Sequence, residues 1–131
     1  DRARLGDIVF ADRSQLSVLN RIVHPAVKDE ILKKIRQEER KNTNLFVIEA
    51  ALLIEDHYDE ICDEIWYIYV EEAVRENRLY YSRGYDGARI KSIMRAQLPK
   101  EMFLEHSDRV IDNSGVFAET MLQLDKIIKE L

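Results

Sequence analysis

The chain has 131 residues, of which 46% are hydrophobic and 34% are charged, and this balance is ordinary for one globular domain. Its formal net charge of −5 argues against a general binder of nucleic acid or of anionic membranes, and no apolar run is long enough to cross a bilayer. The single cysteine, Cys62, excludes an intrachain disulfide and suits a reducing compartment, so we expect a cytoplasmic protein.

The first forty residues are helical in pattern. Apolar residues among charges predict a short amphipathic helix over residues 1–10, and Asp12 is a suitable N-cap for a second helix. We expect the second helix to end at His24, because a residue before proline is pushed out of helical geometry. Pro25 suits the first turn of a third helix, and polar residues 42–44 then break the pattern.

A continuous apolar run follows at Leu45–Ile48 and ends in a carboxylate, Glu49. Such a run predicts a strand that is covered on both faces, as in a parallel sheet. Ligands of open α/β sheets bind beyond the carboxyl ends of the strands, so Glu49 would lie at the edge of a binding crevice. Two further strands are expected at Ile65–Val70, which is rich in β-branched and aromatic residues, and at Arg109–Asp112.

Helices are expected between and after these strands. One runs over residues 71–83, where Gly84 ends it, and another over residues 87–97. A closing helix carries an apolar face made of Phe117, Met121, Leu124, Ile128 and Leu131. Helices that join successive buried strands favour an α/β fold with a parallel sheet.

Six basic residues gather between positions 75 and 95, where only two acidic residues oppose them. Arginine suits phosphate because its planar guanidinium donates two parallel hydrogen bonds and keeps its charge. The segment is therefore either a pair of solvated helices with exposed arginines or a lid that closes on a polyphosphate.

Two shorter features also have a structural and a functional interpretation. Asn113-Ser114-Gly115 is either a plain strand-to-helix turn or a loop whose backbone groups contact a nucleotide base. His24 is either a capping or core residue or part of a binding site. The three histidines are far apart and lack metal-ligand spacing. The chain also contains no G-x-x-x-x-G-K-[ST] phosphate loop and no G-x-G-x-x-G motif.

Taken together, these features resemble the dephospho-coenzyme A kinase family over essentially the whole chain. No single motif carries the resemblance, but the order and spacing of the motifs are specific. The matching motifs are Asp1-Arg2 with Leu5-Gly6 and Val9-Phe10, Leu19-Asn20 with Ile22-Val23-His24-Pro25, Leu52-Leu53-Ile54-Glu55, Arg78-Leu79 with Arg83, Ala96-Gln97, and Ser107-Asp108 through Val110-Ile111-Asp112-Asn113-Ser114-Gly115.

The resemblance implies a P-loop kinase-like fold, a three-layer α/β/α parallel sheet with a helical substrate domain and a helical lid. It implies transfer of the γ-phosphoryl group of ATP to the ribose 3′-hydroxyl of dephospho-coenzyme A, with Mg²⁺, and no nucleic-acid or membrane partner. Residues 1–42 resemble the helical substrate-binding region, 43–70 and 108–131 the α/β core, and 71–98 the lid, all within one kinase domain.

The resemblance also implies roles for individual residues. The lid residues that would contact phosphate are Arg78 and Arg83. The residues near the bound substrate would be His24, Arg2, Leu52 and Leu53. The residues that would contact adenine are Asn113, Ser114 and Gly115. Glu49, which stands where the family usually has Asp, would contact Mg²⁺ through water.

By the same resemblance, the P-loop with its Lys and Ser/Thr would precede Asp1, so we expect the sequence to begin inside a longer chain and the 131 residues alone to be inactive. The P-loop strand would lie between Leu45–Glu49 and Ile65–Val70. We therefore expect these two strands to pair directly or to complete the sheet through a second molecule. Two alternatives stay open: a nucleoside monophosphate kinase of the same superfamily, and a non-catalytic binding or assembly module.

Overall fold

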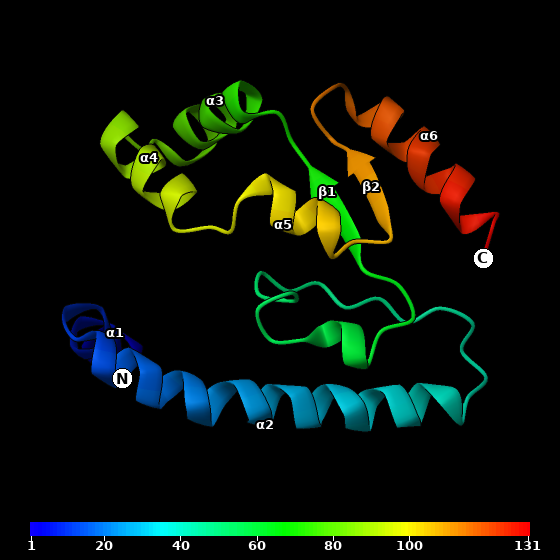
Figure 1. Cartoon of the computed structure of the whole chain (residues 1–131), viewed down its shortest axis with the longest axis horizontal. Coiled ribbons are helices and arrows are strands. Elements are labelled where there is room, and N and C mark those ends of the chain that lie inside the picture. Colours follow the sequence, from blue (N-terminus) through cyan, green and yellow to red (C-terminus); the bar gives the residue numbers. More distant parts are fainter. The chain divides into compact units, whose positions relative to one another are not determined.

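The structure is a computed structural model that describes residues 1, 4–9, 11–12 and 14–131 (Figure 1). The chain divides into two compact units, Asp1–Asp56 and His57–Leu131. The first unit is helical and the second combines helices with a parallel sheet, so the fold is α/β as predicted. None of the helices among the described residues combines the length and hydrophobicity that crossing a membrane requires.

The first unit begins with two helices in contact with each other, α1 (Arg2–Ala11) and α2 (Arg13–Glu39). Asp12 separates them in an extended conformation, and its carboxylate accepts a hydrogen bond of 2.7 Å from the Ser14 amide. This bond satisfies one of the amides left free at a helix start, so the predicted N-cap is confirmed.

The predicted helix boundary at His24 is wrong, because α2 continues through Pro25 as one helix with a total length of 27 residues (Figure 1). A proline inside a helix costs about 3 kcal/mol, since it removes one backbone hydrogen bond and crowds the preceding turn. Once a helix is nucleated, every further residue adds a bond, and a long helix capped by Asp12 can offset that cost. The local preference of a single residue is thus outweighed by the length of the helix around it.

The predicted strand at Leu45–Glu49 is also wrong. Residues 45–50 have no regular secondary structure, and Leu45 and Val47 are 47% and 75% exposed. A strand needs a neighbour for its backbone hydrogen bonds, and the sheet of the described residues contains two other strands only. The expected direct pairing with the strand near Ile65–Val70 is therefore wrong as well. Glu49 does not lie at the end of a strand.

The second unit is built on two parallel strands, β1 (Trp66–Tyr69) and β2 (Arg109–Asp112). Both lie where the sequence predicts strands, and Tyr69 pairs with Asp112 at their carboxyl ends. The long connection between parallel strands is helical, as such a crossover requires. The helices of this unit are α3 (Glu72–Arg83), α4 (Gly87–Arg95), α5 (Lys100–Glu105) and α6 (Phe117–Ile128), and a single 3-10 turn, η1, spans Tyr58–Glu60.

Local chemistry accounts for the ends of α3 and α4. Gly84 follows α3 in the left-handed conformation, with φ of 65°, which glycine adopts without a steric cost. The Asp86 carboxylate accepts a hydrogen bond of 2.8 Å from the Arg89 amide and so caps α4. The short α5 was not predicted. Phe103 from this helix stacks on Tyr67 of β1, with ring centroids 5.0 Å apart.

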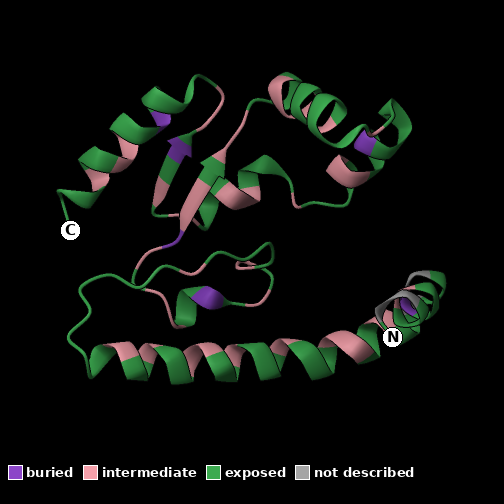
Figure 2. Ribbon diagram, turned by 180° about the vertical axis from the view of Figure 1, so that it is seen from behind, coloured by how far each residue is buried: buried purple, intermediate pink, exposed green. Residues whose placement is uncertain are grey.

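The core of the second unit lies where α6 contacts β2, and Figure 2 shows buried segments on both elements. Ile111 of β2 is completely buried, and Thr120 of α6 is 6% exposed. The apolar face predicted for α6 is not its buried face, since Phe117 is 74% exposed and Leu131 is 63% exposed. A polar residue, Thr120, takes the central buried position instead.

The amino-terminal ends of both strands are joined by an ionic cluster around Arg109. Its guanidinium donates two hydrogen bonds to Glu64, of 2.8 and 3.1 Å, and a third of 2.7 Å to Glu130. The hydrogen bonds from Arg109 and from the Trp66 indole lower the pKa of the Glu64 carboxyl below its ordinary value. The same carboxylates raise the pKa of Arg109. The cluster lies at the strand ends opposite to those where ligands of α/β sheets bind, so we assign it to stability.

Candidate functional site

The carboxyl ends of β1 and β2 form one candidate site in the second unit. The Asn113 amide donates 2.8 Å to the Tyr69 carbonyl, which continues the pairing one residue beyond β2. The Glu71 amide, just after β1, donates 2.8 Å to the Ser114 hydroxyl. The predicted turn Asn113–Gly115 is therefore attached to the ends of both strands, at the edge of the sheet where ligands bind in open α/β folds.

The turn itself is held by side chains on either side of it. The Ser114 amide donates 2.8 Å to the Asp112 carboxylate, and the Val116 amide donates 3.3 Å to the Glu119 carboxylate at the start of α6. Hydrogen bonds from Ser114 lower the pKa of the Asp112 carboxyl, with a smaller contribution from the charge of Lys100. A Cβ atom at Gly115 would collide with the Glu119 carboxylate, so any larger residue there displaces this carboxylate from the turn.

The structure brings one of the two predicted lid arginines to this turn. The Arg78 guanidinium lies 3.5 Å from the Gly115 carbonyl, at the limit of a hydrogen bond, and its side chain is exposed. Arg83 lies five residues further on, in the last turn of α3, and is also exposed. Arg78 is thus next to the predicted base-contacting turn, whereas Arg83 is not brought to it.

A second candidate site lies in the first unit and is centred on His24. Its Nδ1 atom is 2.7 Å from the Asp56 carboxylate, and the two side chains are 30% and 23% exposed. The Lys28 ammonium donates a hydrogen bond of 3.3 Å to the backbone carbonyl of Asp56. The backbone amide of Asp56 donates one of 3.0 Å to the Leu52 carbonyl. The turn after residue 50 is therefore tied to the middle of α2 by these contacts.

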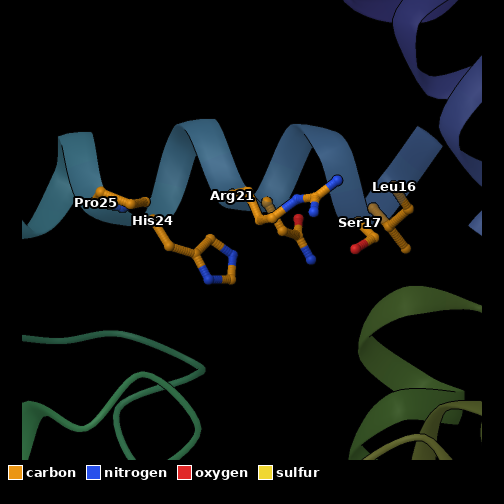
Figure 3. Close-up of a pocket in the computed structure, with 6 residues that line it drawn as sticks. Leu16, Ser17, Arg21, His24 and Pro25 are labelled. Atoms are coloured by element: carbon orange, nitrogen blue, oxygen red, sulfur yellow. The ribbon is translucent and has the colours of Figure 1, made fainter. Parts of the chain in front are cut away.

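An open hollow of about 580 Å³ runs along the same face of α2 (Figure 3). The hollow is shallow, and all of its lining residues belong to α2. The lining residues are Leu16, Ser17, Asn20, Arg21, His24 and Pro25. The lining combines apolar side chains with hydroxyl, amide, guanidinium and imidazole groups, so it can bind a polar molecule that carries negative charge.

The remaining predicted site residues are placed as follows. Leu52 is 42% exposed and contributes its carbonyl to the turn that holds Asp56, and Leu53 beside it is half-buried. Arg2 lies outside the described residues. Glu49 is exposed, and no cluster of three or more potential metal ligands exists among the described residues.

Sequence reasoning missed two residues of the second unit, Thr120 and Gln123, and one of the first, Asp56. Thr120 and Gln123 of α6 hydrogen-bond Asn113 and Asp112, respectively. No local pattern distinguishes these two from the other polar residues of α6, Glu119, Asp125 and Lys126. Asp56 directly follows the Leu-Leu-x-Glu motif, but its partner His24 is 32 residues away, and no local pattern joins them.

Comparisons with known proteins identify the family of the chain. The family model of dephospho-CoA kinase matches residues 1–119. Proteins named dephospho-CoA kinase from Carboxydothermus hydrogenoformans and Enterococcus faecalis are 39% and 33% identical, each over 99% of this chain. The chain spans 63% and 65% of the lengths of these two relatives.

Solved structures also match. A crystal structure from Thermus thermophilus matches all of this chain and 67% of its own, with a TM-score of 0.77 and 23% identity, which supports the fold alone. Dephospho-CoA kinase from Campylobacter jejuni matches 99% of this chain and 64% of its own, with a TM-score of 0.72 and 25% identity. The match over residues 1–119 decides the family: this chain belongs to the dephospho-CoA kinase family, with a P-loop kinase-like fold.

Proposed function

We propose that this chain carries the substrate-holding and base-contacting parts of an enzyme that phosphorylates the ribose 3′-hydroxyl of dephospho-coenzyme A with ATP, the last step of coenzyme A biosynthesis. The observation that carries the proposal is the family match over residues 1–119. In this proposal residues 1–42 hold the substrate, 71–98 form the lid, and 43–70 with 108–131 form the core. The enzyme acts in the cytoplasm on two small molecules, without nucleic acid or membrane.

The hollow on α2 is the proposed site for dephospho-coenzyme A. Its Arg21 guanidinium, Asn20 amide and Ser17 hydroxyl suit a substrate with phosphate and amide groups. Asp56 orients the His24 imidazole through the contact of 2.7 Å, which leaves the other ring nitrogen for the substrate. Arg2, Leu52 and Leu53 belong to the same proposed site by the family resemblance.

The turn Asn113–Gly115 is the proposed contact for adenine, with Arg78 beside it and Arg83 at the end of α3. Phosphoryl transfer depends mostly on positioning and on neutralising the phosphate oxygens. Two exposed arginines on one helix provide charge for the phosphates without the cost of burying it. They would also exclude water when the lid closes.

Mg²⁺ supplies charge neutralisation in reactions of this class. The described residues contain no cluster of three or more potential ligands, and Glu49 is a single exposed carboxylate. The residues present in the described part of the chain therefore do not fit a metal site by themselves, and we assign no step to the metal here. Glu49 as a ligand through water stays a proposal.

The 131 residues alone are proposed to be inactive as a kinase. They contain no G-x-x-x-x-G-K-[ST] motif, and the backbone amides and lysine of that loop hold the β- and γ-phosphates in enzymes of this class. The chain could still bind dephospho-coenzyme A through α2. Calorimetric titration of the chain should show such binding together with no turnover of ATP. Turnover by these residues alone would contradict the proposal of inactivity.

The activity is tested on the complete protein that the gene of this chain encodes. We expect ATP- and Mg²⁺-dependent phosphorylation of dephospho-coenzyme A, with the product carrying a 3′-phosphate by mass spectrometry and phosphorus NMR. Common nucleoside monophosphates should be poor acceptors. A preference for a monophosphate would instead support the nucleoside monophosphate kinase, and a lack of transfer to every acceptor would support a non-catalytic binding or assembly module.

Self-association is a further part of the proposal. The apolar residues Leu45, Phe46 and Val47 are exposed, and β1 has one strand neighbour among the described residues. Unpaired strand edges and exposed apolar segments tend to associate with another chain. Sedimentation of the 131-residue chain should show a concentration-dependent dimer that Val47→Lys weakens. A monomer at every concentration would contradict it.

A further inference from the structure

The buried face of α6 carries two polar side chains that reach the end of β2. Thr120 and Gln123 are three residues apart, so they lie on the same side of the helix. Thr120 is the polar residue that is buried among the described residues, with 6% exposure, and Gln123 is half-buried. A buried hydroxyl reduces stability unless it is hydrogen-bonded, so its presence in so small a core calls for a specific role.

Gln123 holds the last residue of β2. Its side-chain oxygen accepts 2.9 Å from the Asp112 amide, and its side-chain nitrogen donates 2.8 Å to the Asp112 carbonyl. One carboxamide therefore satisfies both backbone groups of a strand residue, as a neighbouring strand would. The same nitrogen also donates 3.2 Å to the Glu119 carbonyl, which fixes the rotamer of Gln123. The strand end is therefore attached to α6 through one side chain.

Thr120 holds the next residue, Asn113. Its hydroxyl donates a hydrogen bond of 3.0 Å to the side-chain oxygen of Asn113. The backbone amide of Asn113 is already bonded to the Tyr69 carbonyl. An asparagine carboxamide has one accepting and one donating end. Because Thr120 occupies the accepting end, the NH₂ group is the end of the Asn113 side chain left for a ligand. No described residue accepts a hydrogen bond from that group.

We propose that Thr120 and Gln123 are positioning residues that hold the Asn113 carboxamide with its NH₂ group outward, opposite ring atom N1 of the base, so that the turn selects a purine whose N1 is a hydrogen-bond acceptor. Adenine presents N1 there as an acceptor, whereas guanine presents an N1–H donor. The inference rests on the proposed function, because it takes Asn113–Gly115 as the turn that contacts the base. It adds the chemistry by which that turn discriminates between bases and the residues that enforce it.

The test compares Thr120→Val, which keeps the shape and removes the donor, with Thr120→Ser, which keeps the hydroxyl. Both are assayed in the complete protein with ATP and GTP at saturating dephospho-coenzyme A. We expect Thr120→Val to raise the KM for ATP by about fivefold, the usual effect of one hydrogen bond, with kcat unchanged. The KM for GTP should change little, so the preference for ATP falls. Thr120→Ser should restore it.

Ile127→Val is the matched control, because Ile127 lies two turns after Thr120 on the same face of α6 and makes no polar side-chain contact. It should reduce stability without changing the ratio of ATP to GTP. If Thr120→Val and Ile127→Val lower thermal stability alike and leave that ratio unchanged, Thr120 is structural and the proposal is overturned. An equal rise in KM for both nucleotides would overturn it as well.

Asn113→Asp decides the matter if Thr120→Val does not fold. Thr120 can still donate to one carboxylate oxygen, and the outward group then becomes an acceptor, so the preference should shift from ATP towards GTP. An unchanged preference would overturn the proposal. Failure of the proposed function is seen separately, as a lack of phosphoryl transfer to dephospho-coenzyme A. In that case competition between ATP and GTP in calorimetric binding still tests the role of Thr120.

Discussion

Gly115→Ala is expected to leave the second unit less stable than Gly87→Ala does, although each substitution adds the same methyl group. Replacing glycine by alanine at a compatible site stabilises a protein by about 0.4–1 kcal/mol, because the unfolded chain loses conformational freedom. Gly87 lies in the first turn of α4, and a Cβ there meets no atom within 4 Å, so this gain is expected in full.

At Gly115 the same gain is opposed by a specific contact. The new Cβ would collide with the Glu119 carboxylate, which must then leave the Val116 amide that it accepts from at 3.3 Å. Loss of a side-chain bond at a helix start costs typically about 1 kcal/mol. The two effects nearly cancel at Gly115, so the difference between the two variants should be about 1 kcal/mol in favour of Gly87→Ala. For a unit of this size, that is a shift in melting temperature of roughly 4–8 °C.

Urea unfolding of the 131-residue chain measures this difference. Trp66 is the single tryptophan and lies in β1, so its fluorescence reports on the second unit. The Glu119→Ala background is the control, because the collision is absent there and Gly115→Ala should become as stabilising as Gly87→Ala. Equal effects of the two glycine substitutions in the unmodified chain would refute the reasoning, since the close approach at Gly115 would then cost nothing.

Three further outcomes follow from the structure. In the complete protein, Arg78→Ala and Arg83→Ala should each lower kcat/KM on the order of 100-fold while changing the free energy of unfolding by less than about 0.5 kcal/mol, since both arginines are exposed; a parallel loss of stability in thermal melts would make them structural. Folding lowers the pKa of Glu64 below 4.5, so the ionised Glu64 stabilises the fold above pH 4.5, and this stabilisation is lost as the pH falls through the folded pKa. Glu64→Gln should therefore flatten the acid limb of a plot of the free energy of unfolding against pH. Ile111→Ala should destabilise the second unit by about 3 kcal/mol, because the side chain is fully buried, and Val110→Ala by clearly less, because Val110 is 44% exposed; equal urea midpoints for the two would contradict the burial of Ile111.

The second unit could be predicted from its sequence because its elements are determined by short-range chemistry. The structure has a strand at Arg109–Asp112 with the bounds that the sequence predicts, and Gly84 ends α3 in the left-handed conformation. Asp12 likewise begins α2 as an N-cap. For the two helix ends, the residue that determines the element lies next to it, and for β2 the local pattern agrees with a strand partner that is present in β1. Local preference and tertiary structure agree there, and the prediction is confirmed.

The candidate sites were less predictable, because their contacts join residues that are distant in sequence or hidden in a pattern. The turn Asn113–Gly115 could be recognised from its motif, but the helix face that supports it could not. The larger apolar pattern consists of Phe117, Met121 and Leu131, so the sequence predicts that these residues form the buried face. The face with Thr120 packs on β2 instead, because Thr120 and Gln123 find hydrogen-bond partners at the strand end, which the exposed apolar face would not supply.

The segment at Leu45–Glu49 separates two quantities that sequence patterns tend to merge. A run of apolar residues reports how much free energy the segment would gain by leaving water. A strand also needs a neighbour that completes its backbone hydrogen bonds, and a run of side chains carries no information about whether that neighbour is present. Pro25 illustrates the converse, because its local preference against helix is outweighed by the neighbouring turns of α2. Secondary structure in this chain therefore follows the local pattern at β1 and β2, where each strand has its partner, and departs from it at Leu45–Glu49, where no described strand pairs with the segment, and at Pro25, where the surrounding helix prevails.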